Sequence, residues 1–256
     1  MFFLTITKIQ FAESKTTALN TQRATIEINN KLGRSLNVTL EELEARLKNL
    51  ENFEIEARLK LRILEDIEEI KKLQRTYGFY ITHWMGQEII DLFSESPDIS
   101  VVLWFGKFLG KEGIKRYFLG RKPNPELLFA IMQISGVVDV ASDGKTAKGR
   151  WFGHGYEAVP LKKEGVWANY CLGVYENEYV KEDGKWKFKK LEFRLIFSCP
   201  FDECWVKQDR LVPKPEPSDE SFKPDLPFTT DEEKFPTRYP SGRILPFHYK
   251  HPVTGK

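Results

Sequence analysis

Residues 172–194 read LGVYENEYVKEDGKWKFKKLEFR, and this stretch indicates two β-strands joined by a tight turn. Aromatic and β-branched residues recur along it, as is typical of strands, and the Asp-Gly pair in its middle is a strong hairpin signal. Glu176 and Glu178 fall on the same strand face as Leu172 and Val174, because side chains alternate between the two faces. Two carboxylates in a wholly apolar core would be costly. We therefore expect this face to open at one end into a polar cavity or to solvent.

The composition indicates one large domain, or one domain with substantial extensions. The chain has 256 residues, of which 41% are hydrophobic and 13% aromatic, enough for a sizeable core. No apolar run approaches the roughly 20 residues that a membrane-spanning helix needs. The start, MFFLTITKIQFAES, lacks the pattern of a secretory signal. We therefore expect a soluble, cytoplasmic protein that does not bind membranes.

The charges and cysteines argue against several kinds of partner and cofactor. The 39 basic and 37 acidic residues are interspersed, whereas nucleic-acid binding needs a basic patch. Cys171, Cys199 and Cys204 form neither an even disulfide framework nor a pair of zinc ligands, and only four histidines are present. We expect reduced thiols and no metal. The full GxGxxG and GxxxxGK[ST] phosphate-loop patterns are absent from the sequence, so no nucleotide cofactor is expected.

Helical periodicity dominates the first part of the chain. Residues 1–36 form an arm without sustained periodicity, and residues 37–63 a charged amphipathic helix suited to oligomerisation. Thr39 and Glu42 make a capping box at its start. The apolar stripe consists of Leu40, Leu43, Leu47, Leu50, Leu59, Ile63, Ile67, Ile70, Leu73 and Tyr77. We expect a break between two helices at Gly78 and Gly86.

The pattern then changes from helix to sheet. VVLWFGKF predicts a short strand, and KEGIKRYFLG predicts a helix that ends at Gly120. Longer strand-like runs follow, with Asp-Gly turns at 142–144 and 182–184. Helices followed by an antiparallel sheet are typical of an α+β fold. The tail, 206–256, is rich in proline and aromatic residues, and we expect it to wrap over its own or a neighbouring subunit.

Several segments, in this order, resemble the SnoaL-like branch of the NTF2-like superfamily. They are LEDIEEIKKLQRTYGFYITHW, DLFSE, GKFLGKEGIKRYF, SDGKTAKGRW and GVYENEYVKEDGKWKFKKL, and the resemblance covers roughly residues 64–205. It implies a cone of curved antiparallel sheet wrapped by helices, usually oligomeric, with a ligand pocket at the open end. A strand in such a cone has its closed end in an apolar core, so Glu176 or Glu178 would lie near the cavity or its rim.

The resemblance also implies where a reaction would take place. Relatives that catalyse one use a Tyr and an Asp on the first core helix and a His beside the sheet. Tyr77 matches the Tyr, but this chain has Thr82 where the Asp is common and Ile131 where the His often stands. It therefore departs from the scytalone-dehydratase-like pair of catalytic residues.

Other residues offer replacement groups. His83 follows Tyr77 on the helix, and an imidazole can act as acid or base at neutral pH. His154 lies between two glycines, which indicates a bulge or a close backbone approach. Glu176 could take a proton or orient a His. We expect these four residues, Tyr77, His83, His154 and Glu176, to be catalytic. The expected substrate-binding residues are Tyr80, Thr82, Trp151, Tyr156 and Arg194.

Three functions fit these observations. The first is a cofactor-free lyase (a dehydratase, deformylase or related acid/base elimination enzyme) acting on a small aromatic or polycyclic molecule. The second is a non-catalytic small-molecule-binding protein, and the third is a structural or oligomeric interaction module, because the fold alone does not fix the chemistry. We expect a homo-oligomer in each case. His248 and His251 of the tail are expected at a surface or interface.

Overall fold

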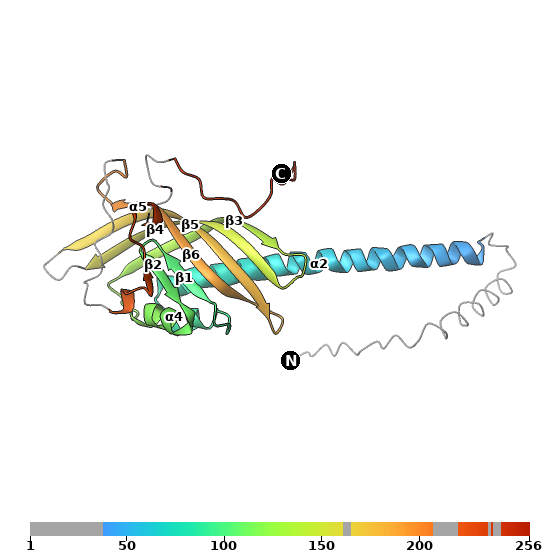
Figure 1. Ribbon diagram of the computed structural model, residues 1–256, viewed down its shortest axis with the longest axis horizontal. Coiled ribbons are helices and arrows are strands. Elements are labelled where there is room, and N and C mark those ends of the chain that lie inside the picture. The colour runs from blue at the N-terminus through green and yellow to red at the C-terminus, as the bar shows by residue number, and fades with distance from the viewer. Residues whose placement is uncertain (1–37, 161–164, 207–219, 235–236, 238–241) are drawn as a thin grey trace. The chain divides into compact units, whose positions relative to one another are not determined.

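The computed structural model describes residues 38–160, 165–206, 220–234, 237 and 242–256 (Figure 1). The expected N-terminal arm lies outside these residues. The chain divides into two compact units, residues 1–58 and 59–256. None of the helices within the described ranges combines the length and hydropathy that spanning a membrane requires.

The first described element is the long helix α2, Leu40–Thr82. The expected capping box is confirmed: the Thr39 N–H donates to Glu42 Oε2 at 2.9 Å, and the Glu42 N–H donates to Thr39 Oγ1 at 3.2 Å. The expected break between two helices is found directly before Gly86, whereas Gly78 lies inside the first helix, so that part of the prediction is wrong. The chain breaks at Trp84, whose φ of 50° is incompatible with a continuing helix. The short helix α3, Gly86–Ile90, follows.

The segment predicted as one short strand forms two. Strand β1, Ser100–Leu103, pairs antiparallel with β2, Gly106–Leu109, so the chain turns between them. Helix α4, Gly110–Leu119, follows directly and has Gly120 as its C-cap, as the sequence predicts.

Four long strands make most of the sheet: β3, Leu128–Val140; β4, Thr146–Pro160; β5, Val166–Glu182; and β6, Lys185–Pro200. The sheet has seven strands in the order β3-β4-β5-β6-β1-β2-β7, where β7 is Leu226–Pro227. The long strands pair antiparallel with one another, whereas β1 and β6 run parallel. The expected α+β cone of the NTF2-like type is confirmed, with a mixed rather than a purely antiparallel sheet.

The Asp-Gly turn between β5 and β6 is a two-residue hairpin. Asp183 and Gly184 have φ of 48° and 76°, the two left-handed residues that a type I′ turn requires. Gly184 adopts this conformation without the steric cost that a Cβ would add. This turn fixes the pairing of the two central strands.

One face of the sheet builds an aromatic core with the helices. Tyr77 of α2 is 4% exposed, and its ring lies edge-on to those of Phe118, Tyr175 and Phe188 at centroid separations of 5.8 to 6.4 Å. Edge-to-face packing at such distances is favourable between aromatic rings. Helices α2 and α4 therefore cover the same face of the sheet, which we call the inner face.

The described parts of the tail contact the sheet and α4 of their own chain. They include the 3-10 helix η1, Glu220–Phe222, and the short helix α5, Asp231–Lys234. The guanidinium of Arg194 lies 4.7 Å from the ring centroid of Phe228, and that of Arg150 lies 4.5 Å from that of Phe247. Phe235 and Tyr239, aromatic residues on which the expected wrapping also depended, lie outside the described residues.

Candidate functional site

Alternation along β4 and β5 decides which side chains face the inside of the cone. On β4 the buried residues are Ala147, Gly149, Trp151, Gly153 and Gly155, and on β5 they include Gly173, Tyr175, Asn177 and Tyr179. Val174 is also buried, at 7% exposure, but it is separate from the core cluster that contains Tyr175 and Tyr179. Odd-numbered side chains of these strands therefore face the core, and even-numbered ones face away from it. We call the second side the outer face.

This register corrects the expected arrangement of site residues. Glu176 and His154 carry even numbers and lie on the outer face, together with Tyr156, which is 40% exposed. Tyr77 is buried on the inner side of the sheet, and His83 is exposed beyond the end of α2. The structure thus does not bring the four predicted catalytic residues together.

The predicted substrate-binding residues are divided in the same way. Trp151 is buried on the inner face, and its Nε1 donates to the hydroxyl of Tyr179 at 3.1 Å. Tyr80 is half-buried against the core. Thr82, also half-buried, donates to the Gly78 carbonyl at 2.9 Å. Arg194 lies on the outer face, where its Nε donates to Glu192 at 2.6 Å.

His154 does not sit in a bulge. The pairing of β4 with β3 and β5 is continuous around it, so of the two expected explanations for its flanking glycines only the close approach holds. A Cβ on Gly153 would lie 2.6 Å from Phe193 and 2.8 Å from Tyr175. Residue 153 must be a glycine because the inward-facing rings of Phe193 and Tyr175 leave no room for a Cβ. His154 is the next residue of the strand, so its side chain points to the opposite, outer face.

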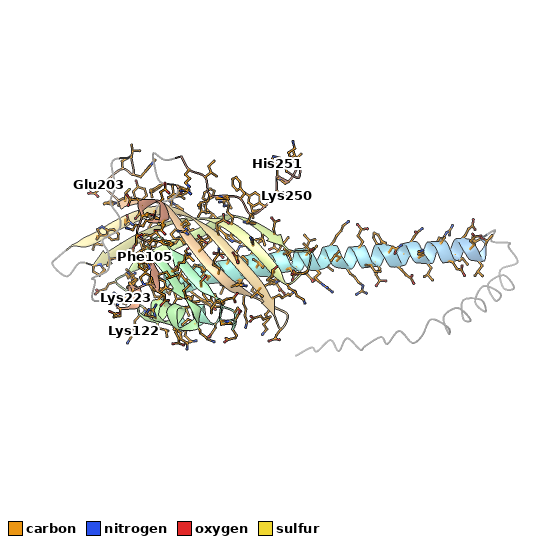
Figure 2. All side chains as sticks on the ribbon, in the orientation of Figure 1. Phe105, Lys122, Glu203, Lys223, Lys250 and His251 are labelled. Carbon is orange, nitrogen blue, oxygen red and sulfur yellow. The ribbon has the colours of Figure 1, made fainter. Side chains whose placement is uncertain are left out.

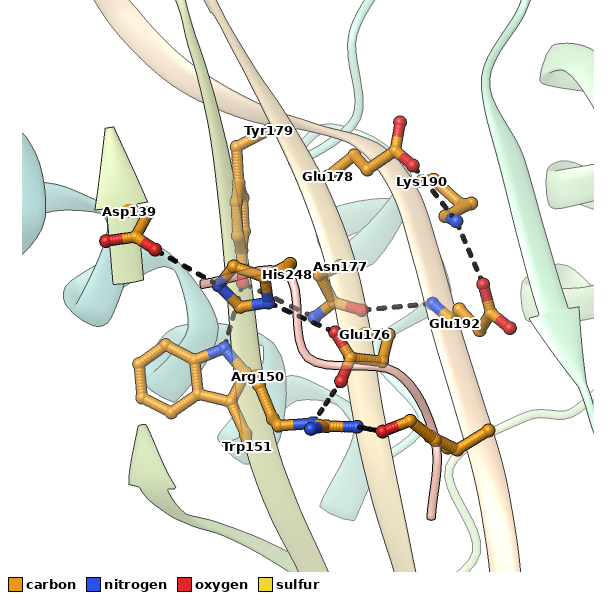
Figure 3. Close-up of polar contacts among 11 residues, drawn as sticks. Asp139, Arg150, Trp151, Glu176, Asn177, Glu178, Tyr179, Lys190, Glu192 and His248 are labelled. Atoms are coloured by element: carbon orange, nitrogen blue, oxygen red, sulfur yellow. Dashed lines mark hydrogen bonds and ion pairs between the residues drawn. The ribbon is translucent and has the colours of Figure 1, made fainter. Parts of the chain in front are cut away.

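The outer face carries an ion-pair cluster that includes the tail histidine (Figure 3). Glu176 forms an ion pair with Arg150, and its other oxygen lies 3.2 Å from Nδ1 of His248. Nε2 of His248 lies 4.0 Å from Asp139, and the side chain is only 6% exposed. Glu178 pairs with Lys190 at 3.0 Å. Both carboxylates of the opening stretch are thus compensated by cations on the outside of the cone.

The inner face holds a buried hydrogen-bond network over its middle. Gln74 Oε1 accepts from Asn177 Nδ2 at 2.7 Å and from the Tyr179 hydroxyl at 2.9 Å. Asn177 Oδ1 accepts the Glu192 N–H at 3.0 Å, next to the point where the β5–β6 register shifts. Burial raises the pKa of Tyr179, so its hydroxyl stays protonated. The network ties α2 to the sheet, and it leaves Gln74 Nε2 buried without a hydrogen-bond partner among the described residues.

A second polar group on the inner face lies where β4 ends and β5 begins. We call it the Glu157 cluster, and it consists of Trp84, Tyr117, Arg121, Glu157 and Cys171. Glu157 and Cys171 come from β4 and β5, Tyr117 from α4, and Arg121 from the residues just after it. Arg121 Nη1 lies 3.7 Å from Glu157 Oε1. Its guanidinium also lies 4.6 Å from the ring centroid of Trp84.

Burial dominates the electrostatics of this cluster. It raises the pKa of Glu157 above its usual range, although the nearby Arg121 opposes the rise. It raises the pKa of Tyr117 to about 12, and that of the Cys171 thiol to about 12 with a further contribution from Glu157. The cluster therefore combines a carboxyl whose proton is held more tightly than usual with a phenol and a thiol that stay protonated.

Trp84 adds an unused hydrogen-bond donor. Its side chain is 2% exposed, and its Nε1–H has no hydrogen-bond partner among the described residues. Its ring contacts those of Phe129 and Tyr117 at 5.3 and 6.2 Å. A buried donor without an acceptor costs free energy, and a bound ligand with an acceptor atom could satisfy it.

Glu157 and its neighbours are absent from the residues predicted from sequence. The signal that could have revealed Glu157 is the spacing of Gly149, Trp151, Gly153 and Gly155, which marks the odd positions of β4 as the inward ones. Extending that alternation by one step reaches Glu157. Arg121 and Tyr117 come from another element, so no local pattern connects them to it.

Two further observations concern other candidate sites. A surface hollow of about 250 Å³ is lined by Leu73, Thr76, Leu92, Trp186 and charged residues of α2 and the β5–β6 hairpin. It is at the opposite end of β5 from Cys171, and it contains none of the predicted site residues. Within the described ranges, no group of three or more His, Cys, Asp or Glu side chains is placed to hold a metal ion.

Comparison with known proteins identifies the family. The SnoaL-like domain matches residues 62–192, whereas a search of curated proteins gave no match. A solved candidate scytalone dehydratase from Novosphingobium aromaticivorans is 20% identical, with a TM-score of 0.46 over 57% of this chain and 93% of that one. Hexachlorocyclohexane dehydrochlorinase LinA-type3 from Novosphingobium barchaimii is also 20% identical, with a TM-score of 0.45 over 60% and 99%. The family match covers half of the sequence, and the chain therefore belongs to the SnoaL-like domain family.

Proposed function

We propose that this protein is a cofactor-free lyase that removes a proton and an oxygen leaving group from a small aromatic molecule at the Glu157 cluster. The observation that carries the proposal is the position of the Glu157 carboxyl, which is 16% exposed and lies 3.7 Å from Arg121; burial there raises its pKa. A carboxylate with a raised pKa is a stronger base than a solvated one, and a pKa closer to the working pH favours general acid/base catalysis.

The neighbours of Glu157 suit the other half of an elimination. In the proposed step the Glu157 carboxylate takes a C–H proton, the released electron pair forms a C=C bond, and the C–O bond breaks. Tyr117, protonated because its pKa is raised to about 12, donates a hydrogen bond to the departing oxygen. Arg121 stabilises negative charge that develops on the substrate.

The same contacts favour an aromatic substrate. The ring of Trp84 contacts those of Tyr117 and Phe129, so apolar rings line the polar groups. A few polar atoms among aromatic side chains are typical of small-molecule sites. The Trp84 Nε1–H would position a carbonyl or hydroxyl oxygen of the substrate. The Cys171 thiol is excluded as a nucleophile at neutral pH, because its pKa is raised to about 12.

We do not assign the chemistry to His154 and Glu176. Both face the outer side of the sheet, and the Glu176 carboxylate is already engaged by Arg150 and His248. Tyr77 remains a candidate for substrate positioning only, because its ring is enclosed by Phe118, Tyr175 and Phe188.

A non-catalytic binding protein is the second candidate. Arg121 lies beside Glu157 and would pair with it whenever the carboxyl is ionised, which weakens the base. A site with an unused Trp donor and an Arg cation could then hold an acidic aromatic ligand without transforming it.

The test is a panel of aromatic diols and hydroxy-acyl compounds, followed by ultraviolet absorbance for a newly conjugated product and by a thermal-shift measurement. The lyase proposal predicts a product with at least one compound, and a turnover that Glu157→Gln lowers by about 10²- to 10⁴-fold, the usual contribution of a general base. Glu178→Gln, on the outer face, is the control and should leave turnover unchanged. Binding without product would favour the second candidate, and neither binding nor product would reject both.

A further inference from the structure

The first half of α2, whose side chains Figure 2 draws as sticks, carries several exposed apolar residues. Leu40, Leu47, Leu50, Leu61 and Leu64 are between 42% and 65% exposed. A solvent-exposed helix gains little stability from propensity alone and usually depends on packing of an apolar face. An exposed row of leucines on a helix therefore indicates a missing partner.

These leucines follow a heptad repeat. Alternating steps of three and four residues from Leu40 reach residues 40, 43, 47, 50, 54, 57, 61 and 64, the a and d positions of a coiled coil. Leu occupies all of them except 54 and 57, which are Glu and Ala. The next two positions are Glu68 and Lys71, which pair with each other at 2.6 Å. The row therefore ends at Leu64.

The domain core uses other positions of the same helix. Ile70 and Tyr77, which are buried against the sheet, fall at c positions of this repeat, and Gln74 and Ile81 fall at g positions. The a and d row is consequently distinct from the stripe that anchors α2 to the sheet. Five of the six leucines of the row are exposed, so its regularity needs another explanation.

We propose that residues 40–64 pair with the same residues of a second copy of this chain as a parallel two-stranded coiled coil. The row spans roughly 37 Å at 1.5 Å per residue, or about three and a half heptads, in the range where coiled-coil patterns become meaningful. The partner is a second copy because the flanking charges complement themselves.

The charges at the e and g positions determine the orientation. In a parallel dimer a g residue of one helix faces the e residue five positions later on the other. Arg46 of one copy then faces Glu51 of the other, and Lys60 faces Glu65, so each pair is attractive.

An antiparallel arrangement would bring e residues opposite e residues and g opposite g. The e row is mostly acidic, with Glu44, Glu51 and Glu65, and the g row holds two cations and no anion. Like charges would then face each other across the seam. The parallel arrangement is therefore favoured.

The interruption in the middle of the row is compatible with this pairing. Glu54 occupies an a position, and Arg58, one turn later, binds its carboxylate at 2.6 Å. The bound guanidinium reduces the charge that would face the seam, although a polar a residue still lowers stability. Ala57 leaves room beside it.

Site-specific disulfide formation tests the proposal on the full chain. In a parallel dimer each d residue faces its own counterpart, so Leu43→Cys and Leu64→Cys should each form a covalent dimer in oxidised glutathione. The two positions are roughly 31 Å apart along the helix, so an antiparallel pair could join at most one of them to itself. Ile55→Cys is the control, because Ile55 is 67% exposed at a b position outside the row.

Light scattering supplies an independent measurement. The wild-type chain should have at least twice the monomer mass of 29.9 kDa, and the double variant Leu47→Glu/Leu50→Glu should halve that mass. Ile55→Glu/Leu59→Glu, with equal charge added outside the row, should leave it unchanged. Circular dichroism of each variant distinguishes the two causes of a lower mass: the β-sheet signal persists if only the helix pairing is lost, and it disappears if the domain unfolds.

The proposal would be overturned by a monomeric wild type, by a double variant of unchanged mass, or by Leu43→Cys and Leu64→Cys variants that cross-link no faster than the Ile55→Cys control. None of these measurements uses catalytic activity. Their failure would therefore leave the proposed lyase chemistry unaffected, and failure of the lyase test would leave the coiled coil unaffected.

Discussion

Two adjacent residues of β5, Asn177 and Glu178, give a direct test of the register. Asn177 is 1% exposed on the inner face, and Glu178 points to the outer face. The test is to replace each with alanine and to compare the free energies of unfolding. Because the residues are neighbours, backbone propensity and strand position are closely matched, and the difference reports which face is buried.

The contacts predict the size of the effect. Asn177→Ala removes three hydrogen bonds: one to Gln74, one from the Glu192 N–H and a longer one to the Tyr179 hydroxyl at 3.4 Å. The two shorter ones each contribute about 1 kcal/mol. The substitution also leaves the Glu192 N–H without its acceptor, which costs a further 1 kcal/mol or so. The expected loss is about 2 to 4 kcal/mol, or roughly 4 to 16 °C in Tm for a domain of this size.

Glu178→Ala should behave differently. Its pair with Lys190 is partly solvated, with side chains 38% and 29% exposed, and such pairs contribute about 0 to 1 kcal/mol. Urea unfolding followed by tryptophan fluorescence gives both values. Equal losses, or a larger loss for Glu178→Ala, would refute the register and with it the placement of Glu157 on the inner face.

Three further outcomes are expected. The pKa of Glu157 is raised in the folded chain, so the contribution of Glu157 to the free energy of unfolding is greatest below its unfolded pKa and is lost as pH rises through its folded pKa. Glu157→Gln should therefore abolish this pH dependence and raise Tm at pH 7 to 8. A lower Tm would contradict the burial argument. Gly153→Ala should cost about 1 to 3 kcal/mol, because its Cβ would overlap the rings of Phe193 and Tyr175; a neutral effect in thermal unfolding would contradict the packing. His248→Ala should make residues 242–256 more susceptible to limited proteolysis by removing the contact with Glu176, and the exposed Lys250→Ala serves as the control.

The sequence predicts those parts of the fold that depend on local chemistry. The capping box of Thr39 and Glu42 and the Asp-Gly hairpin at Gly184 are found where the pattern places them, because each is decided by a few consecutive residues. The α+β order of helices and strands follows for the same reason. VVLWFGKF is the exception: a turn at Trp104 and Phe105 splits it into two strands, and Gly106 directly after the turn, paired with Leu103, is the one local signal of it.

The strand faces could not be predicted in the same way. Both faces of β5 carry apolar and polar residues, so the alternation alone does not say which side is buried. Leu172 and Val174 suggest the even face, whereas the structure buries Tyr175 and Tyr179 on the odd face. The choice depends on long-range packing of these rings against α2. Because the odd face is the inner one, the candidate site contains Glu157, which faces inward, and does not contain Glu176, which faces outward.

The cluster around Glu176 could not be predicted because its members are far apart in the sequence. His248 comes from the tail, and its ring reaches Glu176 across the outer face. The sequence placed this histidine at a surface or interface, and the structure places it, almost fully buried, between the tail and the sheet of the same chain. Contacts of this kind follow from how the tail is routed, which no local pattern specifies.

A comparison of two carboxylates explains why Glu157 is the better functional candidate. Asp66 is buried beneath the β5–β6 hairpin, and its Oδ1 is engaged by Lys181 and accepts a hydrogen bond from Trp186 Nε1 at 2.9 Å. The other oxygen of Asp66, Oδ2, is buried without a hydrogen-bond partner among the described residues. Glu157 lies 3.7 Å from the one cation that pairs with it in the described part of the chain, Arg121. Burial without full compensation costs free energy, and such a cost is typically retained where a group must change its protonation state. Asp66 is held at Oδ1 by two close donors, as in a structural anchor, whereas the longer contact of Glu157 with Arg121 supports the proposal that Glu157 acts as an acid or base.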